Sequence, residues 1–226
     1  MNVLIIAAHP DDEVLGCGGT VARLVREGHD IYTALLGEGV TSRYQKREQA
    51  DQALVEALHT RSQQVAKLLG VKEVLLYNLP DNRFDTVPLL DVIKIIEELV
   101  ERLRPQVIYT HHSGDLNIDH LVVHRAVLTA TRPIADHPVK EIYAFEVPSS
   151  TEWAFGQFRS AFCPTMFVDI KFTLETKLQA MALYKSESHA FPHPRSPEAL
   201  RAIAQRWGSV VGVQYAEAFE LIRSVR

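Results

Sequence analysis

Short, continuous apolar runs recur along roughly the first 130 residues, and each is followed by a stretch with helical spacing. Such runs are typical of strands that are buried on both faces of a parallel sheet. The predicted strands are residues 3–8, 31–36, 74–77 and 107–109. The predicted helices are residues 20–27, 46–69, 89–103 and 119–131, with Gly70 as a helix stop and Asp119 as an N-cap. The alternation predicts an α/β fold with an open, doubly wound, mostly parallel sheet.

The rest of the chain has a less regular pattern. We expect strands over residues 139–147 and 164–170, a helix over 173–184 and a polar loop over 186–197. No linker, repeat or low-complexity tract interrupts the sequence, which predicts a single domain over residues 1–226. No apolar run approaches the ~18 residues that span a membrane. The two cysteines form no CxxC pair, so we expect a reducing, cytoplasmic location.

Composition and charge restrict the class of partner. Apolar residues make up 46% of the chain and charged residues 23%, which is ordinary for a globular protein. The 24 basic and 28 acidic residues give a net charge of 24 − 28 = −4. This balance disfavours binding to nucleic acid or to an anionic membrane, because both require a basic surface. A small-molecule substrate is compatible with it.

Polar clusters follow the predicted strands, at the edge where open α/β sheets bind their ligands. The first strand is followed by residues 9–13, with the sequence HPDDE. Three adjacent carboxylates near a buried sheet edge repel one another, and a divalent cation removes that conflict. His9 and Asp12 are three residues apart in a turn and can face one ion. The alternative is an acidic loop that simply complements the dipole of the following helix.

A second group of candidate ligands follows the fourth predicted strand. His120 and His124 are four residues apart on one helix face, so a metal can take either or both. The alternative is a pair of surface or capping histidines. Because both clusters follow strands that end at the same sheet edge, we expect them to share one cation. Imidazole and carboxylate ligands with room for water suit Zn²⁺ in an open catalytic site, although another divalent metal is compatible.

These motifs carry a resemblance to a known family. The first strand followed by AHPDDE at residues 8–13, with Asp119-His120 later in the chain, is similar to the PIG-L/LmbE-like zinc-dependent N-acetylglucosaminyl deacetylases. The resemblance implies a Rossmann-like fold and an N-acetylated amino sugar or sugar conjugate as substrate. It also implies a homo-oligomer, either a trimer or a hexamer.

The resemblance implies a role for each motif residue. The zinc ligands by position in the motif are His9, Asp12 and His120. Asp11 is the general base that takes a proton from the attacking water. Glu13 is not a ligand, and either supports the site or is a carboxylate at the start of a helix. The resemblance thereby prefers His120 to His124, a choice that the spacing alone leaves open.

One position departs from the family pattern. The family's H-x-D-H motif has Asn117 in place of its first histidine. An asparagine can donate a hydrogen bond to an oxyanion, but it cannot supply a proton. The proton donor for the leaving amine therefore stays open between protonated Asp11 and four histidines, which are His112, His124, His189 and His193.

Loops after the second and third predicted strands offer candidate substrate contacts. Arg43 can pair with a phosphate or with hydroxyl groups, or it can be a solvated side chain. Asp81 can hold sugar hydroxyls and Arg83 an anion, although Pro-Asp-Asn is also ordinary turn chemistry. The resemblance favours Asp81, since the family binds sugar from this loop.

Two further segments allow a functional and a structural interpretation. Residues 188–195 can form a lid that brings His193 or Arg195 to the site, or a rigid surface loop. Trp153 and Phe155 can stack on a sugar, or they can pack in a core or an interface.

Three other functions compete with a deacetylase. A dinucleotide-dependent oxidoreductase would use glycines within residues 16–19 and the acidic Glu38, but Val21 breaks that motif and the adjacent carboxylates would repel a pyrophosphate. A non-catalytic metal or sugar-nucleotide binding protein is supported by Asn117 alone. A metal-dependent phosphohydrolase could use the same ligands. The favoured prediction is the zinc-dependent deacetylase.

Overall fold

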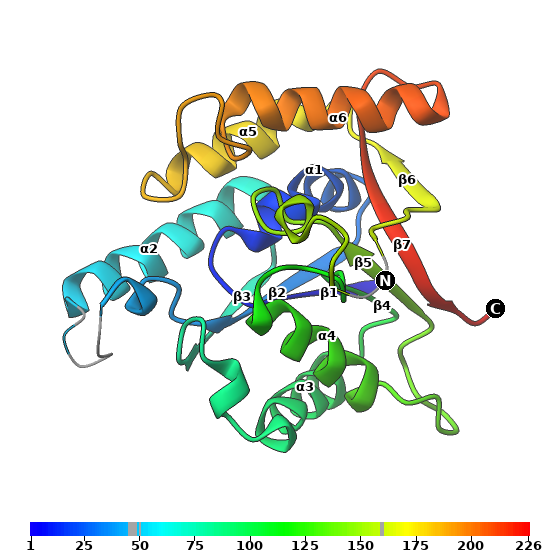
Figure 1. The fold of residues 1–226 in the computed structure, drawn as a ribbon. Coiled ribbons are helices and arrows are strands. Elements are labelled where there is room, and N and C mark those ends of the chain that lie inside the picture. The colour runs from blue at the N-terminus through cyan, green and yellow to red at the C-terminus, as the bar shows by residue number, and fades with distance from the viewer. Residues whose placement is uncertain (45–48, 50, 159–160) are drawn as a thin grey trace.

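A mixed seven-stranded sheet with strand order β3-β2-β1-β4-β5-β7-β6 forms the centre of the molecule (Figure 1). The structure is a computed structural model that describes residues 1–226 except 45–48, 50 and 159–160; the side chain of Arg43 also lies outside the description. The strands are β1 (Asn2–Ala7), β2 (Asp30–Gly37), β3 (Glu73–Leu79), β4 (Val107–His111), β5 (Glu141–Phe145), β6 (Met166–Asp169) and β7 (Ala216–Ser224). Strands β1 to β5 pair in parallel, whereas β7 runs antiparallel to β5 and β6.

Helices cover both faces of this sheet. They are α1 (Asp12–Arg26), α2 (Gln52–Leu69), α3 (Leu89–Leu103), α4 (Ile118–Ala130), α5 (Leu174–Leu183) and α6 (Pro197–Val211). In Figure 1, α3 and α4 lie below the sheet, and α1, α2, α5 and α6 lie above it. A hydrophobic core lies on each face of the sheet. Alternate residues of β1 pack into opposite cores, with Val3 and Ile5 in one and Leu4 and Ile6 in the other. The doubly wound, mostly parallel fold is therefore confirmed.

The first helix begins earlier than expected. Residues 16–19, whose glycines the oxidoreductase interpretation would use, lie inside α1, which begins at Asp12 and kinks at Cys17. The glycines here permit close packing: a Cβ on Gly16 would come within 2.2 Å of the Phe145 ring. This segment is a packed helix rather than a phosphate-binding loop, which removes the basis for the oxidoreductase interpretation.

The second predicted helix is confirmed over Gln52–Leu69, whereas residues 49 and 51 of the prediction lie outside the α-helix. It begins at Gln52 after an Asp51 N-cap and ends at Gly70, which has the expected left-handed backbone (φ 80°). The part of the prediction over residues 46–48 and 50 lies outside the described residues. Across the described chain, no helix is long and apolar enough to cross a bilayer.

The last thirty residues add two elements that the apolar pattern did not predict. Ser196 caps α6, because its Oγ accepts a hydrogen bond from the Ala199 amide at 3.1 Å, and Pro197 follows at the first helical position. Strand β7 then inserts between β5 and β6. All the described elements pack on this one sheet, while the extent of the predicted domain over residues 1–226 stays a prediction.

Candidate metal centre

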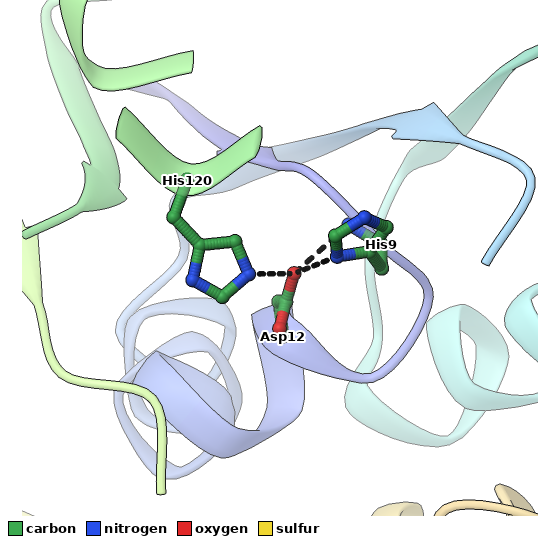
Figure 2. A group of neighbouring side chains, drawn as sticks. All are labelled: His9, Asp12 and His120. Atoms are coloured by element: carbon green, nitrogen blue, oxygen red, sulfur yellow. Dashed lines mark hydrogen bonds and ion pairs between the residues drawn. The ribbon is translucent and has the colours of Figure 1, made fainter. Parts of the chain in front are cut away.

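The predicted ligands lie where the chain passes from the paired strands β1 and β4 into the helices that follow them. His9 follows β1, Asp12 opens α1, and His120 lies in the first turn of α4. Figure 2 shows the rings of His9 and His120 on either side of the Asp12 carboxylate, each with a nitrogen directed at one of its oxygens. Asp12 Oδ2 lies 3.3 Å from His9 Nδ1 and 3.2 Å from His120 Nε2. The fold thus brings together residues that are 111 positions apart at most, since 120 − 9 = 111.

The spacing of these donor atoms fits a small divalent cation. One atom from each residue lies within 4.8 Å of the other two. A tetrahedral zinc site with bonds of ~2.0 Å separates its ligands by about 3.3 Å. Both ring nitrogens of His120 are buried without a properly aligned hydrogen bond, although carboxylate oxygens lie near each of them. A cation beside Nε2 would satisfy that unpartnered nitrogen, so these residues fit the metal that was predicted.

The electrostatics of the cluster favour a cation. Burial raises the pKa of Asp12, but the neighbouring His120 and His9 outweigh it and hold that pKa well below its usual range. Burial lowers the pKa of His120, but Asp12 and Asp115 overcome this and raise it to about 9. Without a metal, the carboxylate charge is therefore balanced by protonated imidazole. Because a metal needs neutral imidazole ligands, its binding would release such protons.

The second ring nitrogen of His9 is held by two carboxylates. His9 Nε2 lies 2.9 Å from Asp119 Oδ2 and 3.3 Å from Asp81 Oδ1. This arrangement turns His9 Nδ1 toward Asp12, as in the carboxylate–histidine–zinc arrangement of known zinc sites. His9, Asp81 and Asp119 also form a second group whose spacing could hold a metal.

Asp119 is not the N-cap of α4, and that prediction was wrong. Asn117 is the cap, with its Oδ1 accepting a hydrogen bond from the Asp119 amide at 2.9 Å. The Asp119 carboxylate instead accepts hydrogen bonds from the amides of Asn82 (2.6 Å) and Phe84 (2.9 Å), in addition to its contact with His9. Three donors from other segments stabilise this buried carboxylate better than one local amide would.

Asp115 supports His120 in the same way, although no role was predicted for it. Its Oδ2 lies 3.1 Å from His120 Nδ1, and its carboxylate accepts hydrogen bonds from the hydroxyls of Ser150 and Thr151. Burial raises the pKa of Asp115, but His120 outweighs it and lowers that pKa to about 2. The signal in the sequence was a carboxylate in the loop after β4, close to the predicted ligand.

The geometry favours His120 over His124 as the ligand. His124 is on the same helix, but its Nδ1 lies 2.8 Å from the carbonyl oxygen of His111, away from the ligand group. His111 itself packs its ring on that of His120, with the centroids 3.9 Å apart. Its Nε2 accepts a hydrogen bond from the Ala8 amide, and burial lowers its pKa well below the usual value. His111 is therefore a neutral support for the His120 ring.

Asp11 lies beside the ligand group rather than within it. Its backbone has a left-handed φ of 111°, and its amide donates to Glu13 Oε2 at 2.9 Å. Its carboxylate accepts a hydrogen bond from Arg195 Nη1 at 2.6 Å. Burial raises the pKa of Asp11 more than Arg195 lowers it, so the group binds a proton more readily than an ordinary aspartate.

Glu13 has the supporting place that was expected of it. It lies in the first turn of α1, where its Oε1 accepts a hydrogen bond from the Tyr184 hydroxyl at 2.7 Å. Burial raises its pKa to about 7. Since its other oxygen binds the Asp11 amide, Glu13 fixes the backbone of Asp11 rather than contacting the ligand group.

A cavity of about 510 Å³ opens over the ligand group. Its described lining includes Asp81 and Asn117 from the predicted substrate contacts, and Trp153, Glu187 and Arg195 from later in the chain. Arg83 is exposed and is not among the described lining residues. Arg43 belongs to a short 3-10 turn (Thr41–Arg43), but its side chain is outside the description. Arg195 therefore reaches the cavity, while a lid over residues 188–195 stays a prediction.

None of the four histidines considered as proton donors is among the described residues that line this cavity. His112 Nδ1 lies 2.6 Å from Glu220 at the β7 side of the sheet. His189 and His193 pack against each other with ring centroids 4.3 Å apart. His193 also contacts two cavity-lining residues, the Trp153 ring and the Arg195 amide.

Comparison with known proteins gives this geometry its context. The family model described as PIG-L, GlcNAc-PI de-N-acetylase, matches residues 4–131, which is more than half of the chain and includes every proposed ligand. The chain belongs to the PIG-L family. The family predicted from AHPDDE and Asp119-His120 is thereby confirmed.

Relatives in this family span most of the chain. An uncharacterized deacetylase, YaiS of Escherichia coli K12, is 30% identical over 193 residues, covering 82% of this chain and 91% of its own. The diacetylchitobiose deacetylase of Thermococcus kodakarensis is 26% identical, covering 99% of this chain and 84% of its own. The family and these relatives confirm the predicted enzyme class, a deacetylase.

A solved structure of another protein has a similar fold. The solved structure of N,N′-diacetylchitobiose deacetylase from Pyrococcus horikoshii superposes with a TM-score of 0.77 at 21% identity, covering 98% of this chain and 84% of the other. At that identity the likeness shows the fold alone, and it agrees with the predicted Rossmann-like architecture.

Proposed function

We propose that this PIG-L family protein is a zinc-dependent hydrolase that removes the acetyl group from an N-acetylated amino sugar or sugar conjugate. The observation that carries the proposal is the convergence of His9, Asp12 and His120 at the floor of a polar cavity, with Asp11 beside them. The two free cysteines, Cys17 and Cys163, support a reducing location such as the cytoplasm. A homo-oligomeric state stays a prediction.

His9, Asp12 and His120 are the residues that would hold zinc or another divalent metal. When bound, such a metal lowers the pKa of a water molecule and polarises the acetamide carbonyl group. Asp119 and Asp115 keep the two imidazoles correctly oriented for it, since each of them contacts the ring nitrogen that faces away from Asp12.

Asp11 transfers the proton in the proposed reaction, and Asn117 stabilises the negative charge that develops on the substrate oxygen. Asp11 accepts a proton from the attacking water, and its raised pKa favours that step. Asn117 uses Oδ1 to cap α4, which leaves Nδ2 as the donor for the developing oxyanion. Asp11 then returns the proton to the leaving nitrogen, because it is the proposed acid that lies at the cavity. The products are acetate and a free amine.

The rim of the cavity offers contacts for the sugar. Asp81 lines it, and its Oδ1 lies near His9 while its Oδ2 accepts a hydrogen bond from the Ser42 amide at 3.0 Å. Trp153 also lines the cavity and is 41% exposed, which suits stacking against a sugar ring. Arg43 and Arg83 remain predicted contacts for a substrate that extends beyond the described lining.

The test is a panel of N-acetylated sugars and sugar conjugates, scored for free amine and acetate with the zinc-loaded protein. We expect equal amounts of both products, and we expect Asp11→Asn to retain zinc while kcat falls about 10²- to 10⁴-fold. Zinc binding without acetate release from any member would favour a non-catalytic binding protein. Release of phosphate from phosphorylated sugars, without acetate, would favour a phosphohydrolase.

A further inference from the structure

Arg195 reaches the cavity from the loop that precedes α6. Its Nη1 donates to Asp11 Oδ2 at 2.6 Å, and its Nε donates to Ser149 Oγ at 2.7 Å. Glu187 lies 3.7 Å from the same Nη1. One guanidinium group therefore joins the N-terminal motif to two segments that lie more than 130 residues later in the sequence.

The position of Arg195 is fixed by the start of a helix. The next residue, Ser196, is fully buried and caps α6, and its amide donates to the His193 carbonyl oxygen at 2.9 Å. The Arg195 amide in turn bonds to His193 Nδ1 at 3.1 Å. The side chain is 81% buried (100 − 19 = 81), so the guanidinium is not a freely moving surface group.

The backbone of Asp11 is fixed from the other side. Its left-handed φ of 111° is a strained conformation for an aspartate, and the bond from its amide to Glu13 maintains it. The backbone fixes where the carboxylate starts, but the side-chain torsions still decide where the oxygens point. Arg195 is the described side chain that bonds to those oxygens and thereby restricts them.

A free Asp11 carboxylate would have two competing positions. It is adjacent in sequence to the proposed ligand Asp12, so it could turn toward the cation and become a ligand itself. A carboxylate bound in that way cannot take a proton from water. Because the planar guanidinium of Arg195 donates a hydrogen bond to Asp11 Oδ2, Oδ1 is left as the oxygen that accepts the proton.

We propose that Arg195 is a positioning residue that holds the Asp11 carboxylate for proton transfer, so that the loop before α6 forms part of the active site. The inference rests on the proposed function, because it gives Arg195 a task in that same reaction. Since Asp11 and Glu187 already flank its charge, Arg195 is not a site for an anionic substrate group.

The experiment compares Arg195→Ala with wild type in the zinc-loaded full chain, using an uncharged N-acetyl sugar. We expect kcat to fall roughly 10- to 100-fold while KM and zinc content change little. Arg195→Lys should recover only part of the rate, because an ammonium group cannot grip both Asp11 and Ser149. Arg201→Ala is the matched control: this arginine lies on α6 and pairs with the exposed Glu175, and its loss should leave kcat unchanged.

A double-mutant cycle separates positioning from a general structural role. If Arg195 acts through Asp11, adding Arg195→Ala to Asp11→Asn should cost little beyond the loss caused by Asp11→Asn alone. Guanidinium ion added to Arg195→Ala should restore part of the rate. If Arg195→Ala fails to fold, Ser149→Ala offers the same test, with a smaller fall in kcat and the same insensitivity in the Asp11→Asn background.

Each contrary outcome has a distinct meaning. A rise in KM with unchanged kcat would show that Arg195 binds substrate, and fully additive losses in the cycle would show that it does not act through Asp11. Either result would overturn the inference while leaving the deacetylase proposal intact. Full activity of Asp11→Asn would instead remove the proposed base, and with it the proposed mechanism.

Discussion

The two parts of this chain contribute differently to one site. Residues 4–131, which match the PIG-L family model, contain most of the parallel strand β1, the parallel strands β2 to β4 and all three proposed metal ligands. The later part contains the antiparallel strand β7 and supplies groups that act on the first part: Ser150 and Thr151 hold Asp115, and Arg195 holds Asp11. All three proposed ligands thus lie within the family-matched part, while the later part supplies side chains that hold Asp115 and Asp11 in place.

The largest expected effect lies in the first part, where removal of a ligand should abolish zinc binding. We expect His120→Ala to lose its bound zinc and its deacetylase activity together, because Nε2 contributes one of three protein ligands. His124→Ala removes another buried histidine of α4 that bonds to a carbonyl oxygen instead, so it should retain zinc. Zinc content per chain, measured by mass spectrometry after dialysis, decides between them. Equal zinc loss in both variants would contradict the assignment of His120, rather than His124, as the zinc ligand.

A smaller effect is expected for the group that orients a ligand. Asp119→Asn should weaken zinc affinity roughly 10- to 100-fold, because an amide holds His9 Nε2 less strongly than a carboxylate does. Competition with a chromophoric chelator measures the affinity. Asp91→Asn, an exposed change in the first turn of α3, is the control and should have no effect. Unchanged zinc affinity in Asp119→Asn would mean that His9 needs no such support.

The pH dependence of zinc binding tests whether the proposed imidazole ligands in the first part release protons when zinc binds. Because the His120 pKa is raised to about 9 in the metal-free protein, zinc must displace a proton at neutral pH. Burial lowers the pKa of His9, but Asp119 and Asp12 outweigh it and raise that pKa well above its usual value. We therefore expect zinc affinity to rise between about tenfold and a hundredfold per pH unit, with a smaller slope once His120 loses its proton above about pH 9. The protonated His120 also stabilises the folded metal-free protein; that stabilisation is complete below pH 6.5 and is lost as pH rises through about 9. Isothermal titration in several buffers measures the released proton.

Asp115→Asn is the matched variant for this titration. Since Asp115 is one of the two carboxylates that raise the His120 pKa, the decrease in slope should occur at lower pH in the variant. An unchanged pH for this decrease would show that another group controls the proton release.

The smallest expected effect concerns the later part alone. Trp153→Ala should raise KM about fivefold for a disaccharide substrate, because a stacked ring contributes about 1 kcal/mol. Phe155→Ala is the control: this residue is two positions away and exposed, but it is not among the described cavity-lining residues. Steady-state kinetics on a disaccharide and a monosaccharide would compare them. Equal KM values for Trp153→Ala and wild type would remove Trp153 from substrate binding.

The difference between the two parts also explains what the sequence could predict. Strands buried on both faces leave continuous apolar runs, so β1, β2 and β4 were visible in the pattern. Their carboxyl ends locate the ligand loops by topology alone. Strand β7 changes from buried to exposed along its length, so its last residues lack an apolar run.

Contacts between distant segments left no local signal. The bond between Arg195 and Asp11 joins residues 184 positions apart, and nothing in either segment names its partner. For Asp119, local capping rules favoured the wrong role, because the tertiary contacts with Asn82 and Phe84 outweigh them. The start of α6 was predictable in principle from the Ser196-Pro197 pair, which follows the usual rules for a helix N-terminus.

The central claim concerns the position of the metal, and anomalous diffraction from a zinc-loaded crystal tests it most directly. The account predicts a single peak at ~2.0–2.2 Å from His9 Nδ1, a carboxylate oxygen of Asp12 and His120 Nε2, with Asp11 outside bonding distance. A peak between His9, Asp81 and Asp119 instead, or no peak at either group, would contradict it.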